Sequence, residues 1–164
     1  MRDVVNEKDE IVGRATKEEV AAQNLICRVC FIMLVNSRDE LLLHQRSANK
    51  KAYPLYWSGA AAGHLVSGEG YLEAAQREMM EEIGVEADLE FVGKFFSEDD
   101  REMVGVFLGY HDGPIEIEPL EVKQVDYFSL ARLELEMPGM KVTSFVERSL
   151  PLILPRLGGR SADH

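Results

Sequence analysis

Cysteine and long apolar runs are both scarce in this chain. Its 164 residues include two cysteines, Cys27 and Cys30, and no apolar run approaches the length that spans a bilayer. Residues three apart in a strand point to opposite faces, so this C-x-x-C pair predicts two reduced core thiols rather than a zinc or redox site. The N-terminus has neither the basic start nor the apolar core of a signal peptide. These absences predict a cytoplasmic protein with no membrane partner.

Positive charge is also in short supply. The chain has 18 Lys and Arg against 29 Asp and Glu, a formal net charge of −11. This balance argues against a broad basic footprint for duplex nucleic acid. It also repels phosphate esters at long range, so a phosphorylated small-molecule substrate would need bound divalent metal and local cations. The length and the 46% hydrophobic content fit one globular domain over residues 1–164.

The most informative stretch runs from residue 63 to residue 85 and reads GHLVSGEGYLEAAQREMMEEIGV. Glycines and a serine open it as a loop, and Gly84 supplies a helix stop. Apolar residues between them recur at three- and four-residue spacing, which predicts an amphipathic helix packed against a sheet. The members of this apolar stripe are Leu72, Ala75, Met79 and Ile83.

The same helix carries carboxylates where a purely structural helix gains nothing from them. Glu78 and Glu82 are like charges one turn apart, and Glu81 and Glu82 lie in the last turn, where the helix dipole is negative. Arg77 is within reach of Glu81 and of Glu73, but no Lys or Arg stands one turn from Glu78 or Glu82. One interpretation is a solvated acidic face. The other is a site for Mg²⁺ or Mn²⁺, which prefer hard oxygen ligands.

The spacing resembles the box of the Nudix hydrolases, G-x5-E-x7-R-E-U-x-E-E-x-G-U, where U is a bulky apolar residue. The matching positions are Gly63, Glu69, Arg77, Glu78, Met79, Glu81, Glu82, Gly84 and Val85. The resemblance implies an α/β (α+β) Nudix fold, a mixed β-sheet sandwiched between α-helices with the box as loop, helix, loop. It also implies metal ligands at Glu78, Glu81, Glu82 and the Gly63 carbonyl, with Glu69 and Arg77 orienting them.

The rest of the chain reads as strands and helices around this box. We expect an N-terminal hairpin at about 3–15, a short helix after Thr16, and a buried strand over 26–35. Further strands and a helix follow the box, and a C-terminal helix is expected at about 143–154, limited by Pro151, before a loose tail at 158–164. The hairpin and the C-terminal helix are candidate surfaces for a homodimer.

Three cations are candidates for binding substrate phosphate. Arg28 lies within the apolar strand and needs an anionic partner, either a structural carboxylate or a substrate phosphate. Arg46 and Lys50 lie on a loop upstream of the box, where they suit phosphate steering or simply decorate a surface loop.

A wider resemblance, over about residues 3–130, is to the isopentenyl-diphosphate isomerases of the same fold. These enzymes carry a catalytic cysteine where this chain has Ala62, arginine where it has Glu78, and an aromatic residue where it has Glu81. Each departure favours hydrolysis over isomerisation. A non-catalytic nucleotide-binding module is a further alternative, which the intact glutamates disfavour.

The resemblance implies hydrolysis of a diphosphate linkage in a nucleoside diphosphate-X substrate, by attack of water at phosphorus. Glu78 and Glu82 would hold the metal that activates the water. Glu102, in the second strand after the box, is our candidate general base; its alternative reading is an exposed glutamate at a strand edge.

Overall fold

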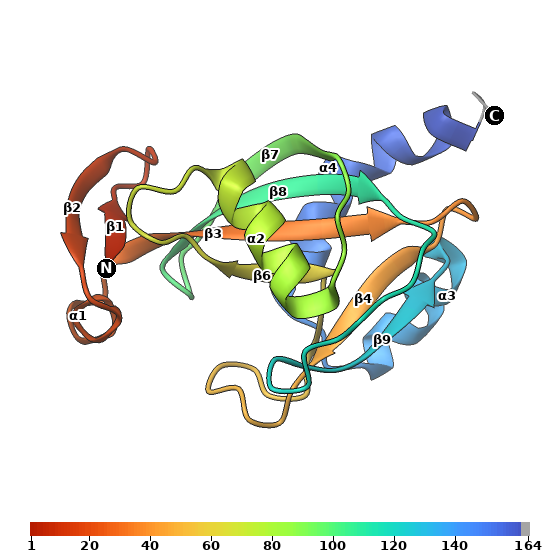
Figure 1. Ribbon diagram of the computed structural model, residues 1–164, viewed down its shortest axis with the longest axis horizontal. Helices are drawn as coiled ribbons and strands as arrows, with labels where there is room; N and C mark the ends of the chain where they lie inside the picture. The colour runs from red at the N-terminus through yellow and green to blue at the C-terminus, as the bar shows by residue number, and fades with distance from the viewer. Residues whose placement is uncertain (162–164) are drawn as a thin grey trace.

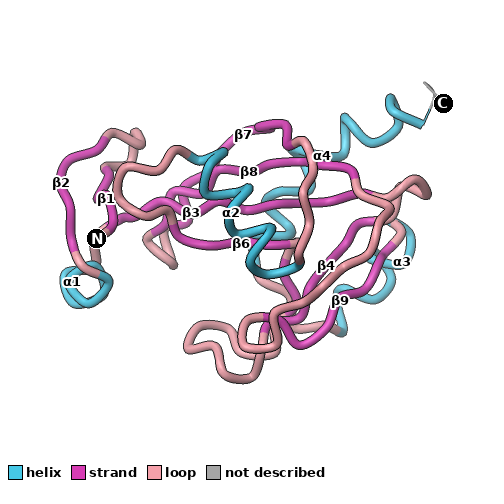
Figure 2. Tube along the Cα trace, in the orientation of Figure 1, coloured by secondary structure: helices cyan, strands magenta, loops and turns pink. Residues whose placement is uncertain are grey.

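Within residues 1–161, nine strands form one sheet, with helices on both of its faces (Figure 1; Figure 2). The computed structural model describes residues 1–161, and side chains as far as Leu157. The strands are β1 (Arg2–Val5), β2 (Ile11–Ala15), β3 (Ile26–Val35), β4 (Leu41–Arg46), β5 (Trp57–Ser58), β6 (Ala61–His64), β7 (Leu89–Ser97), β8 (Glu102–Tyr110) and β9 (Val122–Phe128). The helices are α1 (Lys17–Gln23), α2 (Tyr71–Ile83), α3 (Leu130–Glu136), the 3₁₀ turn η1 (Met137–Gly139) and α4 (Ser144–Ser161).

Strand β3 is the centre of the sheet. It runs parallel to β8 along its length, from Cys27 opposite Glu102 to Val35 opposite Tyr110. It is antiparallel to β1, β4 and β6. A sheet with both kinds of pairing, covered by helices on two faces, confirms the predicted fold class. Nearly every residue of β3 is buried, as expected for a strand covered on both faces.

Alternate side chains of β3 enter two separate cores. Phe31 and Met33 join a core with residues of α3 and α4. Ile32 and Leu34 join the opposite core, beneath α2. In Figure 1, α2 accordingly crosses in front of the sheet and α4 lies behind it. The box helix is therefore held against one face by a core of its own.

The N-terminal hairpin and the short helix after it form as the sequence predicts. Thr16 caps α1: its Oγ1 accepts a hydrogen bond from the Glu19 N–H (3.1 Å), and the Glu19 carboxylate accepts one from the Thr16 N–H (3.2 Å). This reciprocal pair satisfies two backbone donors that the helix itself leaves free. The hairpin and α1 lie at the end of β3 (Figure 1).

The C-terminal helix is longer than predicted. Instead of ending near Leu154, α4 continues through Pro151 and Pro155 to Ser161, so residues 158–161 of the expected loose tail are helical. Each proline removes one helical hydrogen bond. Burial of Ile153 and Leu157, four residues apart, against the sheet offsets that loss. The last part of the predicted tail, 162–164, lies outside the described residues.

The box differs in two details from its predicted form. It begins within a strand, because Gly63 and His64 belong to β6. Leu72 is 46% exposed and lies off the buried stripe, whose small members are Ala74 and Ala75. Gly84 ends the helix in the left-handed conformation, with φ 65°, as the sequence predicts.

A structural carboxylate accounts for Arg28. Its Nε donates to Asp9 Oδ1 (2.7 Å) and its Nη2 to the Asp9 carbonyl (2.8 Å). Lys94 Nζ and the Tyr71 hydroxyl donate to the other carboxylate oxygen, Oδ2 (2.8 and 3.0 Å). Burial alone would raise the pKa of Asp9, but these donors outweigh it and lower that pKa. Asp9 thus ties the hairpin to β3, β7 and α2, and Arg28 is no longer a candidate for binding phosphate.

We predict that Asp9→Asn destabilises the fold by about 3 kcal/mol, because it leaves the partly buried Arg28 without its counter-charge. Asp39→Asn is the matched control. Asp39 ends a turn of the same form as Asp9, with φ 55° against 62°, but no ion pair among the described residues involves it. Asparagine tolerates this conformation as aspartate does. Urea unfolding of both variants measures the difference, and equal losses would contradict it.

Candidate functional site

Two carboxylates of α2 meet against the backbone of β6. Glu82 is 5% exposed, and the Ala62 N–H points to its Oε1 at 3.5 Å. Glu78 packs over Gly63, where an added Cβ would lie 2.2 Å from the Glu78 Cδ. Only glycine permits this approach. The helix and the strand together therefore bring both carboxylates against the backbone around Gly63, whose carbonyl accepts a hydrogen bond from the Cys30 thiol (3.4 Å).

This pair carries an electrostatic cost that a cation would relieve. Burial and the neighbouring Glu78 carboxylate raise the pKa of Glu82 well above its usual range. Two like charges of this kind, one buried and one half-buried, fit a divalent cation with oxygen ligands. Glu81 contributes less to the pair, because its side chain is 58% exposed and turns towards Arg77.

Arg77 organises the carboxylates around it. Its Nε and Nη2 donate to both oxygens of Glu69 (2.8 and 2.9 Å), and Nη2 also contacts the His64 carbonyl (3.3 Å). Its Nη1 donates to Glu78 (2.8 Å) and Glu81 (3.3 Å). The expectation that Glu78 lacks a cationic neighbour was therefore wrong, because spacing by helical turns overlooks the adjacent residue. The Glu69 carboxylate is the main cause of the raised pKa of Arg77.

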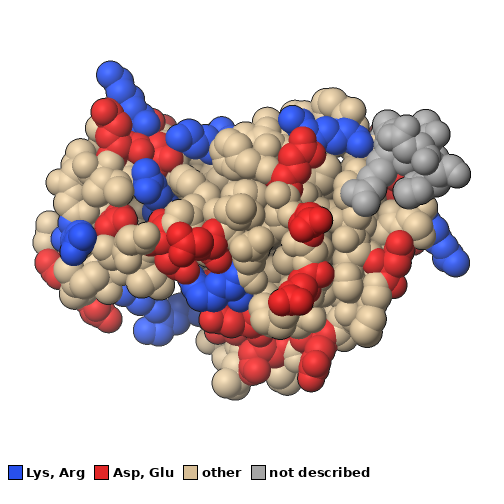
Figure 3. Space-filling model, turned by 45° about the horizontal axis from the view of Figure 1, so that its top comes forward, with Lys and Arg blue, Asp and Glu red and all other residues tan. Residues whose placement is uncertain are grey.

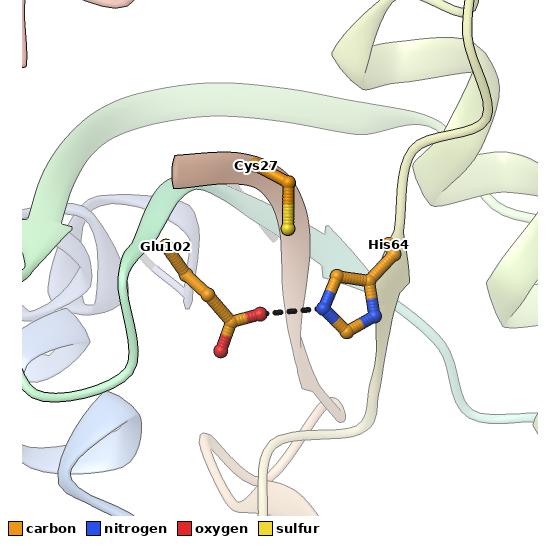
Figure 4. A group of neighbouring side chains, drawn as sticks. All are labelled: Cys27, His64 and Glu102. Atoms are coloured by element: carbon orange, nitrogen blue, oxygen red, sulfur yellow. Dashed lines mark ion pairs between the residues drawn. The ribbon is translucent and has the colours of Figure 1, made fainter. Parts of the chain in front are cut away.

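A second cluster lies on the other side of β6. Cys27 of β3, His64 of β6 and Glu102 of β8 point towards one another (Figure 4), and their ligand atoms lie within 4.8 Å of each other. His64 Nε2 is 2.7 Å from Glu102 Oε2. A thiol, an imidazole and a carboxylate are together able to hold a borderline ion such as zinc. No spacing along the chain indicates this cluster, because its three residues come from three strands and Cys27 has the pattern of an ordinary core residue.

Two adjoining cavities surround these groups. The larger, of about 940 Å³, is lined by the box glutamates Glu78, Glu81 and Glu82, and by Arg77. The smaller, of about 400 Å³, is lined by the Cys27, His64 and Glu102 cluster with apolar residues around it. The backbone from Ala62 to His64 borders both cavities.

The two upstream cations predicted to bind phosphate, Arg46 at the end of β4 and Lys50 on the loop after it, line both cavities. Arg46 Nε donates to the Ala52 carbonyl (3.0 Å). Burial lowers the pKa of Arg46, and the carboxylates of Glu82, Glu121 and Glu102 oppose that shift. Lys50 forms an ion pair with Glu121. Arg28, by contrast, lines neither cavity.

Comparison with known proteins identifies the family of this chain. Residues 26–144 match the sequence model of the NUDIX domain family. An uncharacterized Nudix hydrolase of Pseudomonas aeruginosa is 35% identical over 126 residues, which cover 75% of each chain. This chain belongs to the Nudix hydrolase family.

Other relatives of this Nudix hydrolase agree on the fold and leave its reaction open. A crystal structure from Deinococcus radiodurans superposes with a TM-score of 0.80 at 24% identity, covering 92% of this chain and 98% of that one. Isopentenyl-diphosphate Delta-isomerase I of Camptotheca acuminata is 36% identical over 100 residues. That match covers 52% of this chain and 43% of the isomerase, so the chain spans less than half of that relative.

The surface of the hydrolase is mixed in charge. On the face in Figure 3, basic and acidic side chains are interspersed, and the basic ones form no continuous stripe. Among the helices within residues 1–161, none has the length and apolar character needed to cross a bilayer.

We predict that His64 is protonated at pH 7. Burial lowers its pKa, but hydrogen bonds with Cys27 and Glu102 outweigh burial and raise the pKa of His64 to about 9. Because this lies above the unfolded value of about 6.5, the pair stabilises the fold below that pH, and its contribution is lost as the pH rises through 9. NMR titration of the imidazole tests this. In Glu102→Gln the midpoint should fall by at least about one unit, and an unchanged midpoint would contradict the assignment.

Proposed function

We propose that this Nudix hydrolase uses Mg²⁺ or Mn²⁺ to cleave a diphosphate linkage in a nucleoside diphosphate-X substrate, by attack of water at phosphorus. The observation that carries the proposal is the pair formed by the buried Glu82 and the half-buried Glu78, in a cavity that Arg46 and Lys50 also line. Carboxylates for a metal and cations for phosphate oxygens thus lie within one cleft.

Each of these groups has a defined task in the proposal. Glu78, Glu82 and the Gly63 carbonyl would hold the metal, and Glu81 would join them if its exposed side chain turned inward. When bound, the metal neutralises phosphate oxygens and lowers the pKa of a coordinated water. Arg46 and Lys50 bind the non-bridging phosphate oxygens, and Lys50 exchanges its pairing with Glu121 for the substrate.

Two further groups support this chemistry. Arg77, clamped by both oxygens of Glu69, fixes the Glu78 carboxylate, since one guanidinium bonds both side chains. Glu102 is the proposed general base, taking the water proton on a carboxylate oxygen. Its side chain is 16% exposed, lines the smaller cavity and is oriented by His64, so it is not the exposed edge glutamate of the alternative reading.

The cytoplasmic location and the homodimer stay predictions from the sequence. The isomerase alternative lacks a thiol at Ala62, next to the box glycine. A non-catalytic nucleotide-binding module would bind the same ligands without turnover, so product analysis separates it from a hydrolase.

We predict that Glu82→Gln lowers kcat by at least about a thousandfold, because removal of a metal-holding carboxylate abolishes charge stabilisation in the site. Its melting temperature without metal should be equal or higher, because the variant removes a buried like-charge interaction with Glu78. Mg²⁺ should raise the melting temperature of the wild type but not of the variant. The assay combines product analysis on nucleoside diphosphate-X compounds, nucleoside triphosphates and isopentenyl diphosphate with thermal melting.

Glu86→Gln is the control, because Glu86 is an exposed glutamate just beyond the same helix. It should keep both turnover and the response to metal. A Glu82→Gln variant that melts well below the wild type would make Glu82 a structural residue. Formation of dimethylallyl diphosphate would establish isomerisation instead, and nucleotide binding without turnover would establish the binding module.

A further inference from the structure

The residues that line both cavities, here called the border, carry charged side chains of one sign. The residues that line both cavities include four cations, Arg2, Lys17, Arg46 and Lys50, and no Asp or Glu. The acidic side chains line one cavity or the other, never both: the box glutamates face the larger cavity and Glu102 the smaller. In a chain of net charge −11, this border is a local site for an anion.

Arg2 and Lys17 differ from Lys50 and Arg77, the cations near the site that carboxylates already neutralise. Arg46, Lys51 and Arg101 also form no ion pair within the described residues, but of these three Arg46 alone lines both cavities. Lys50 is neutralised by Glu121, and Arg77 by three glutamates. Among the ion pairs of the described residues, none involves Arg2 or Lys17. Their charges therefore remain available to a ligand.

The fold explains why these two side chains lie together, but it does not explain their charge. Arg2 opens β1 opposite Ala15 of β2, and Lys17 follows the capping residue Thr16 as the first residue of α1. A cation in the first turn of a helix opposes the helix dipole, so Lys17 does not stabilise α1. The hairpin and the capping box place the two cations, and neither needs their charge.

Both residues belong to a segment that lies outside the family match, which begins at residue 26. This segment also builds the wall of the smaller cavity, to which it contributes Val20 and Leu25. It is therefore placed to recognise the part of the substrate that varies, while the box performs the shared chemistry.

We propose that Arg2 and Lys17 form an anion subsite for the X group, so that the enzyme prefers nucleoside diphosphate-X substrates in which X bears a phosphate or a carboxylate. This inference rests on the proposed function. With the diphosphate between the box carboxylates and Arg46, an X group directed into the smaller cavity passes Arg2 and Lys17. An anionic X gains charge-assisted hydrogen bonds there, and a neutral X does not.

The test uses the double variant Arg2→Gln/Lys17→Gln in the full chain. Its matched control is Lys8→Gln/Arg38→Gln, which removes the same charge from exposed positions that line neither cavity and form no ion pair within the described residues. UDP-glucose and UDP-glucuronate serve as substrates, because they differ by one carboxylate on X. Physiological ionic strength suppresses long-range charge effects.

The wild type should prefer UDP-glucuronate, and the double variant should lose at least about tenfold of that preference, mainly through KM. Hydrolysis of UDP-glucose should change little, and the control should behave as the wild type. An equal kcat/KM ratio in all three proteins, or an equal loss in variant and control, would overturn the subsite.

A binding measurement separates failure of this subsite from failure of the proposed function. Titration calorimetry with inorganic tripolyphosphate, in the presence of EDTA, reports on the cations without turnover. The double variant should bind at least about tenfold more weakly than the control. If no substrate is hydrolysed but this difference persists, the subsite stands and the proposed hydrolysis fails. If tripolyphosphate binds variant and control equally, the subsite is absent.

Discussion

The close approach of the Glu78 carboxylate to the backbone of Gly63 is the constraint on which the site depends. A side chain at position 63 would occupy the space of that carboxylate, so β6 and α2 could not keep their present separation. The same approach brings Glu82 under the Ala62 amide. One glycine thus couples the position of a strand to the position of two acidic side chains, and the core beneath α2 maintains the distance.

The negative charges of the Glu78 and Glu82 pair are partly compensated by a cation outside the pair, Arg77. Arg77 spans Glu69, Glu78 and Glu81, so a single guanidinium offsets part of the repulsion and holds the loop before α2. None of the hydrogen bonds of Arg77 within the described residues goes to Glu82, whose pKa is raised by burial and by Glu78. Repulsion that the protein leaves uncompensated is concentrated at one carboxylate, which is where a metal ion would gain most from binding.

The sequence predicted what depends on spacing along the chain and missed what depends on tertiary contact. Strand β3, the cap at Thr16 and the box were predictable from local patterns. The partner of Arg28 was not, because Asp9 comes from a hairpin nineteen residues away along the chain. Pro151 misled the prediction of α4, since packing of Ile153 and Leu157 outweighs the proline's local preference. The register of three strands brings Cys27, His64 and Glu102 together, and no single-sequence pattern contains that register.

The positions of the charged residues suggest a division of labour within the chain. The net charge of −11 repels phosphate esters at long range, so attraction for such a substrate comes from cations close to the site. Cations attract a ligand most where no carboxylate pairs with them, and in the described chain that condition holds for Arg2, Lys17 and Arg46 at the border of both cavities. Arg46 serves the diphosphate in the proposed function, which leaves Arg2 and Lys17 for the X group. Their supporting segment is anchored by Asp9, which binds Arg28, Lys94 and Tyr71. The proposed selectivity therefore depends on an ion pair remote from the reacting atoms, because Asp9 positions the hairpin that carries Arg2.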